Sequence, residues 1–90
     1  MYEYQENIVK KLNFSDSKLL EEFILYLVQI MKKRKISQAS FAAEIGVDAK
    51  TISRWVTGKN KCSVVNFLNI ISIVGIDNFL NYLSEKFMEQ

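Results

Sequence analysis

Residues 37–58 decide the fold, and they read SQASFAAEIGVDAKTISRWVTG. Two short amphipathic stretches, 38–45 and 49–57, flank a turn at 46–48 that contains glycine. Two short helices joined by such a turn form a helix-turn-helix unit. The sequence therefore predicts this unit at the centre of the chain.

The residues of this unit suit the packing that it needs. We expect Ala42 to let the two helices approach closely, and Gly46 to take the turn with a positive φ. Val47, Ile52 and Trp55 are expected to anchor the second helix to the core. The opposite face of that helix carries small or hydrophilic residues, which are Ala49, Lys50, Ser53 and Arg54.

Outward from the unit, glycines and capping residues predict four more helices. The chain has no proline and three glycines, which is typical of long helices that end at glycine. The six predicted helices are 2–12, 18–34, 38–45, 49–57, 64–74 and 78–88. Their expected N-caps, from the second helix on, are Asp16 or Ser17, Ser37, Asp48, Ser63 and Asp77. Gly58 and Gly75 are expected to close the fourth and fifth helices.

Three segments carry apolar side chains at helical spacing outside the unit. They are the stripe of Tyr4, Ile8 and Leu12, the helix at 19–31, and the stripe of Phe79, Leu80, Leu83 and Phe87. The first and last stripes could complete the core of a monomer or form a two-fold interface. We favour a homodimer through the last helix, together with the N-terminal segment. The helix at 19–31 has more than one apolar face, which predicts burial on several sides.

Composition limits the class of protein. A chain of 90 residues fits one compact domain, and 49% hydrophobic residues can supply a small core. Residues 32–61 hold eight basic and two acidic side chains, a net charge of +6, whereas the rest of the chain carries −4. Positive charge concentrated in this way is expected of a nucleic-acid-binding face.

Several function classes lack the residues that they require. The chain has no histidine and a single cysteine, Cys62, so we expect no disulfide framework, no metal site and no cofactor. Neither a catalytic triad nor a phosphate-binding glycine loop is present in the sequence, so an enzyme is discounted. The N-terminus has no signal pattern, and charges break the apolar stretch 19–31, so no membrane span is expected. We expect a cytoplasmic protein of bacterial or phage origin, associated with the nucleoid.

The run 37–58 resembles the DNA-binding domain of the Cro/phage-repressor (XRE-type) family. Members of this family typically read S/T-Q-x-x-L-A-x-x-x-G-V-S-x-x-T-I-S-R-W-E-x-G, and the run keeps that register without a gap. The matching positions are Gln38, Ala42, Gly46, 51–55 and Gly58. The resemblance covers residues 19–76, including a fourth family helix at 63–76.

The resemblance implies an all-α bundle of five to six helices with a lambda-repressor-like helix-turn-helix. The implied organisation is an N-terminal extension at 1–17, the DNA-binding domain at 18–76 and a C-terminal helix at 77–90. That last helix is the candidate dimerisation element.

The resemblance also implies a set of DNA contacts. Gln38 would touch a phosphate or the outermost base, Thr51 would touch a phosphate, and Ala49, Lys50 and Arg54 would face base edges in the major groove. The residues expected at the DNA are Gln38, Ala49, Lys50, Thr51, Ser53, Arg54, Lys59, Asn60 and Lys61. The chemistry agrees, because Arg can pair bidentately with guanine and Lys can contact phosphates.

Four positions depart from the family pattern. Lys35 stands where glycine is usual, so the end of the long helix is expected to differ. Cys62 replaces a common proline, and Val56 replaces an acidic residue. Asp48 replaces a serine; it can still cap the helix, but its charge near phosphate would oppose binding.

These observations predict a sequence-specific regulator of transcription that binds double-stranded DNA at a pseudo-palindromic operator, most simply as a repressor. The alternative is the DNA-binding antitoxin of a toxin–antitoxin pair, which would also mask a protein partner such as a toxin. The N-terminal extension and the apolar helix at 19–31 could dock that partner. A protein-binding module without a DNA function is a further alternative. On that interpretation the positive charge of residues 32–61 would have no role in function.

Overall fold

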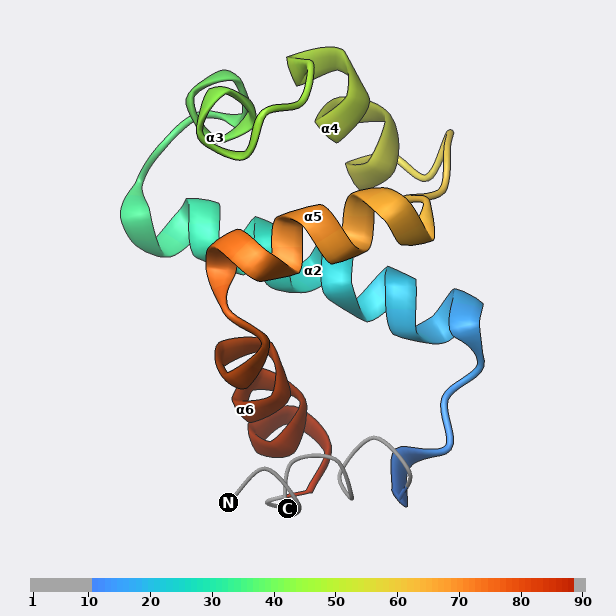
Figure 1. The fold of residues 1–90 in the computed structure, drawn as a ribbon. Coiled ribbons are helices and arrows are strands. Elements are labelled where there is room, and N and C mark those ends of the chain that lie inside the picture. The colour runs from blue at the N-terminus through green and yellow to red at the C-terminus, as the bar shows by residue number, and fades with distance from the viewer. Residues whose placement is uncertain (1–10, 89–90) are drawn as a thin grey trace.

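A computed structural model describes residues 11–88 of the chain. Over that range the fold is all-α, with five helices and no strand. The helices are α2 (Asp16–Arg34), α3 (Gln38–Ile45), α4 (Ala49–Val56), α5 (Val64–Val74) and α6 (Ile76–Phe87). Figure 1 shows α3 and α4 at one end of the molecule, α6 toward the other end, and α2 and α5 crossing between them. The predicted all-α class is confirmed.

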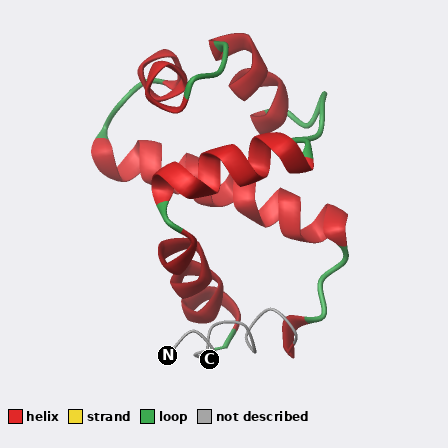
Figure 2. Cartoon of the chain, viewed as in Figure 1, coloured by secondary structure: helices red, strands yellow, loops and turns green. Residues whose placement is uncertain are grey.

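The N-terminal prediction lies largely outside the described residues. Of the helix expected at 2–12, only residues 11 and 12 are described, and both are helical. Tyr4 and Ile8 of its stripe lie outside that part of the chain, whereas Leu12 packs against the core. Figure 2 shows helices joined by loops and turns throughout the described chain.

Four helices begin at a side-chain oxygen that accepts a hydrogen bond from an amide of the first turn. Such a cap satisfies one of the backbone donors that have no partner within the helix. The four cap-to-amide distances are 3.1 Å for Ser15 to Lys18, 3.0 Å for Ser37 to Ser40, 2.8 Å for Asp48 to Lys50 and 3.1 Å for Ser63 to Asn66. The predicted caps Ser37, Asp48 and Ser63 are confirmed.

Two predicted caps are wrong. The cap of α2 is Ser15, whose backbone is extended, whereas Asp16 already lies in the helix. For α6, Gly75 (φ 96°) is at once the C-cap of α5 and the N-cap of α6, so it is the single residue that separates the two helices. Asp77 therefore lies inside the first turn of α6, where it makes no capping hydrogen bond.

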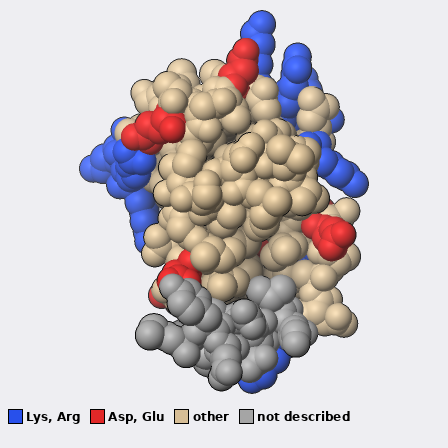
Figure 3. Space-filling view, viewed as in Figure 1, with Lys and Arg blue, Asp and Glu red and all other residues tan. Residues whose placement is uncertain are grey.

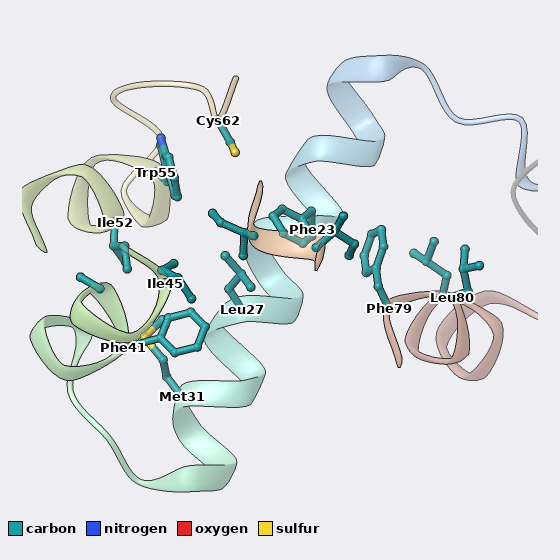
Figure 4. Packing of buried hydrophobic residues seen from close by; sticks show 14 residues of the cluster. Phe23, Leu27, Met31, Phe41, Ile45, Ile52, Trp55, Cys62, Phe79 and Leu80 are labelled. Carbon is teal, nitrogen blue, oxygen red and sulfur yellow. The ribbon is translucent and has the colours of Figure 1, made fainter. Parts of the chain in front are cut away.

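One hydrophobic cluster joins all five helices, and α2 runs through its middle. Phe23, Leu27 and Met31 repeat every four residues along α2 and are 0%, 2% and 6% exposed. Figure 4 shows them between side chains of α3 and α4 on one side and of α6 on the other. The other buried members are Phe41, Ala42, Ile45, Ile52, Trp55, Cys62, Ile70, Ile71, Phe79, Leu80 and Leu83. The expected anchoring by Ile52 and Trp55 is confirmed, while Val47 is half-buried at the edge.

The apolar stripe of α6 is buried within the monomer. Phe79 and Leu83 are 1% and 0% exposed, and Phe87 packs edge-on against Phe14 with ring centroids 5.1 Å apart. Of the two interpretations left open for this stripe, completion of the monomer core is the one observed. Within 19–31, Leu25 is the one large hydrophobic residue that remains exposed.

No single helix of the described chain is long and apolar enough to cross a membrane. Together, α5 and α6 have the length and composition of a membrane span, but the two helices are bent by 97° at the break between them.

A buried carboxylate connects α2 to α6. Glu22 is 2% exposed, and its Oε1 accepts hydrogen bonds from Lys86 Nζ at 2.8 Å and from the Tyr82 hydroxyl at 3.3 Å. Its Oε2 lies 3.2 Å from Lys18 Nζ. Burial raises the pKa of Glu22, but the hydrogen bonds and charges of Lys86 and Lys18 more than offset this effect, so its pKa lies below the ordinary value.

This carboxylate makes stability depend on pH. A folded-state pKa below the unfolded value stabilises the fold at neutral pH, and that contribution is lost as the pH falls through the folded-state pKa. We expect Glu22→Gln to lower the free energy of unfolding by about 2 kcal/mol near neutral pH, because Lys86 loses a charged partner. The difference should shrink in acid. Urea denaturation at several pH values measures it, with the exposed Glu21→Gln as control; a difference that does not change with pH would contradict the assignment.

The end of α2 carries backbone strain. Lys35 closes the helix in the left-handed region, at φ 55° and ψ 44°, and its amide donates to the Lys32 carbonyl at 3.2 Å. Glycine adopts this conformation without the steric cost that a side chain brings. The departure noted at this position therefore changes the residue but keeps the conformation that glycine would take.

Replacing Lys35 should relieve that strain. We expect Lys35→Gly to raise the free energy of unfolding by about 0.5–1 kcal/mol. Lys35→Ala removes the same charge but keeps a Cβ, so it should give no such gain. Thermal or urea unfolding of the two variants makes the comparison, and equal stability of the two would show that the conformation carries no cost.

Candidate nucleic-acid interface

The interface is built on α4, which is anchored from one side. Ile52 and Trp55 are 1% and 6% exposed and hold the helix against the core. Lys50, Ser53 and Arg54 lie on the opposite face and are exposed. This division follows from the 3.6-residue period of the helix, because residues three or four apart share a face.

The turn before α4 sets its direction. Gly46 adopts φ 76°, as predicted, and its amide donates to the Ala42 carbonyl. The amide of Val47 donates to the same carbonyl at 3.0 Å. Because Ala42 is almost fully buried and has only a methyl side chain, α3 and α4 can pack closely at this point.

The residues in the first turn of α4 differ in their exposure to solvent. Lys50 is exposed, and its amide is held by the Asp48 carboxylate. Thr51 is half-buried, and its amide donates to the Asp48 carbonyl at 2.9 Å. Ala49 is also half-buried and packs against the core, so only part of its methyl surface faces outward. The predicted DNA contacts of Ala49 and Thr51 stay predictions.

The loop after α4 is tied back to the helix. Gly58 turns the chain at φ 79°, and the Arg54 carbonyl accepts the amides of Lys59 at 2.9 Å and Asn60 at 3.3 Å. All three predicted loop residues, Lys59, Asn60 and Lys61, are exposed. The loop is therefore held beside the end of α4 that carries Arg54.

Cys62 anchors the other end of this loop. Its side chain is 3% exposed, and burial raises the pKa of its thiol to about 11. The thiol is therefore neutral at physiological pH and packs as a small apolar group.

Gln38 belongs to the neighbouring helix. It is exposed at the first position of α3, directly after the cap Ser37. Figure 1 shows α3 and α4 together at one end of the molecule. The structure thus brings the predicted residues of α4 and the following loop into one region, with Gln38 on the helix packed beside them.

An ion pair that sequence reasoning missed lies between α2 and α3. Arg34 donates two hydrogen bonds of 2.8 Å to the two carboxylate oxygens of Glu44. These hydrogen bonds hold the pKa of Glu44 below its ordinary value. The two residues are ten positions apart on different helices, so no local spacing signals the pair. Arg34 was counted above in the basic segment, and its guanidinium is engaged in this ion pair with Glu44.

The charge that remains at this end is strongly positive. With Arg34 and Glu44 paired, the segment 32–61 keeps six lysines and Arg54 against the single carboxylate of Asp48. Figure 3 shows basic side chains around the α3–α4 end of the molecule and along the side where α2 ends. Among residues 11–88, no group of three or more side chains could hold a metal ion. An exposed, basic helix face beside a basic loop suits the major groove and the phosphates that line it.

Comparison with known proteins bears on this site. The chain matches the family described as Helix-turn-helix (HTH_3) over residues 27–77, more than half of its length. That range runs from the middle of α2 to the start of α6 and includes α3, α4 and the loop. No curated protein and no solved structure gave a significant match. The chain belongs to the Cro/C1-type (XRE) family of DNA-binding helix-turn-helix proteins.

Proposed function

We propose that the protein is a sequence-specific regulator of transcription that inserts α4 into the major groove and represses by occluding a promoter. The observation that carries this proposal is the exposed face of α4. Its Lys50, Ser53 and Arg54 project away from a helix that Ile52 and Trp55 fix in place. Family membership supports DNA binding, and the geometry of α4 supports reading by base contact.

The proposal assigns base contacts and phosphate contacts to different residues. The side chains of Lys50 and Arg54 form no ion pair with another residue of the described chain, so both cations are available for base edges. Arg54 can pair bidentately with guanine O6 and N7. Lys59 and Lys61, held in the loop beside Arg54, contact phosphates and set the register of the helix in the groove.

Two copies on a pseudo-palindromic operator complete the proposal. A single helix-turn-helix makes few base contacts, and a dimer doubles them across two half-sites. Regulation of this kind takes place where the DNA is, in the cytoplasm of a bacterial cell and on its nucleoid.

The antitoxin alternative draws support from one surface. An apolar groove of about 380 Å³ lies between the first half of α2 and the end of α4 with its loop. Leu20, Ile24, Leu25 and Val56 line it, and it could accept a segment of a protein partner. Co-purification of a neighbouring gene's product, lost on Leu25→Asp, would favour this alternative.

Titration against duplex DNA tests the regulator. The specific duplex carries the upstream region of the protein's own gene, and a scrambled duplex of the same length is the control. We expect the specific complex to be about a thousandfold tighter, with an affinity that falls as salt rises.

Two variants separate base contacts from phosphate contacts. Arg54→Ala should weaken the specific complex about ten- to a hundredfold and leave the scrambled duplex nearly unaffected. Lys59→Ala should weaken both complexes similarly and reduce the salt slope by about one. Equal, weak binding of the wild-type chain to both duplexes would refute sequence-specific regulation.

Asp48 provides a separate test of where the DNA lies. Its carboxylate caps α4 with a 2.8 Å hydrogen bond to the Lys50 amide, at the end of the helix that enters the groove. Serine keeps a capping oxygen and removes the negative charge. We expect Asp48→Ser to bind the specific duplex roughly three- to tenfold more tightly, because repulsion from phosphate is removed. Asp48→Ala, which lacks the cap, controls for helix stability, and unchanged affinity of Asp48→Ser would place the phosphates elsewhere.

A further inference from the structure

The residue that closes α2 has a backbone conformation that is unusual for its type. In the described chain, Asn13 and Lys35 are the two non-glycine residues with a positive φ, at 53° and 55°. Asparagine tolerates the left-handed region because its short side chain can hydrogen-bond locally, whereas lysine has no such compensation. Residues held in costly conformations cluster at functional sites. The cost at Lys35 therefore points to a function for its side chain.

The backbone around Lys35 is held on both sides. Its amide donates to the Lys32 carbonyl at 3.2 Å, and the amide of Ile36 donates to the Met31 carbonyl at 3.1 Å. Ile36 then packs against the core, and Ser37 caps α3. The base of the lysine side chain is thus fixed in place, while the side chain itself is exposed.

The positive charge of Lys35 is not used within the fold. The last turn of α2 already carries three basic residues, so the helix dipole needs no further cation. Of these three, Arg34 is engaged in its ion pair with α3. Lys32 and Lys33 line two surface grooves that α2 forms with α6, and Glu85 lines both grooves. Lys35 lines neither groove and forms no ion pair with another described residue.

Lys35 lies at the edge of the candidate interface. It precedes Gln38, the first residue of α3, by three positions, so their Cα atoms are at most about 11 Å apart. Figure 1 shows the end of α2 on the side of α3 that lies away from α4, and Figure 3 shows basic side chains there. When the second helix of such a unit occupies the major groove, the first helix crosses the DNA backbone. Lys35 then faces the backbone beyond α3.

We propose that Lys35 binds a phosphate of the DNA that flanks the half-site, outside the bases that α4 reads. The proposal rests on the regulator function above, in which α4 enters the major groove. A phosphate contact carries no sequence information, but it raises affinity and fixes the orientation of the protein on the duplex. The left-handed end of α2 thus lowers stability and raises DNA affinity.

Opposite changes in stability and affinity test this role. Lys35→Gly should unfold at a higher denaturant concentration than wild type and yet bind the upstream duplex about three- to tenfold less tightly. The slope of log affinity against log salt should fall by about one. Lys35→Ala should show the same loss of affinity, and Lys35→Arg should keep the wild-type affinity. Full affinity of the glycine and alanine variants would overturn the contact.

Lys33→Ala is the matched control. It removes the same charge two residues away, from a side chain that lines a groove against α6. At about 0.15 M salt this variant should bind nearly as tightly as wild type, because salt screens charges that do not touch the DNA. Equal losses for Lys33→Ala and Lys35→Ala would show a diffuse effect of net charge and would also overturn the contact.

The length of the duplex locates the phosphate. With upstream duplexes shortened one base pair at a time, wild type should lose about three- to tenfold in affinity at the step that removes the contacted phosphate. Lys35→Ala should lose nothing further at that step. A loss of the same size in both chains would place the lysine away from the flanking DNA.

The same titrations separate this proposal from the regulator function. If wild type binds the upstream and scrambled duplexes equally, while Lys35→Ala weakens both and lowers the salt slope, the phosphate contact stands and sequence-specific regulation fails. If wild type prefers the upstream duplex and the Lys35 variants keep full affinity, the regulator function stands and the contact fails. A wild-type chain that binds neither duplex overturns both.

Discussion

The burial of Ile52 and Trp55 is the constraint on which the rest of the structure depends. A helix of eight residues is marginal in water by itself, so α4 exists because these two side chains pack into the core. Their positions leave Lys50 and Arg54 on the outer face. The Arg54 carbonyl then holds the amides of Lys59 and Asn60, so the same anchoring also positions the loop.

Local features of the structure could be predicted from the sequence, and contacts between distant residues could not. Ser37, Asp48 and Gly46 each act within a few residues of themselves, so residue type and spacing identify them as caps or turn. At the start of α2, three neighbouring polar residues could each cap, and spacing alone does not choose Ser15 among them. The bidentate pair of Arg34 with Glu44 joins different helices and has no sequence signature.

The spacing of apolar residues identifies which side chains share a helix face, but it does not show whether that face packs within the monomer. The stripe with Phe79 and the outer face with Leu68 both have helical spacing. Packing against α2 takes Phe79 into the monomer and leaves Leu68 outside. The sequence pointed to α6 as the candidate dimerisation helix, which stays a prediction; several exposed large hydrophobic residues of the described chain, Leu68 among them, lie on α5. What distinguishes α5 in the sequence is the lack of any charge between Lys61 and Asp77.

The unfavourable charge of Asp48 and the proposed pairing of two copies on one operator are connected through affinity. On the proposed function, the Asp48 carboxylate that caps α4 approaches phosphates, and its charge lowers the DNA affinity of each copy below what the lysines alone would give. When two sites are joined, the second binding event becomes intramolecular, and modest affinities combine into a strong one. On the proposed function, a weak half-site contact in each of two copies makes occupancy depend on the concentration of the protein. The amount of protein then sets the response of the proposed regulator.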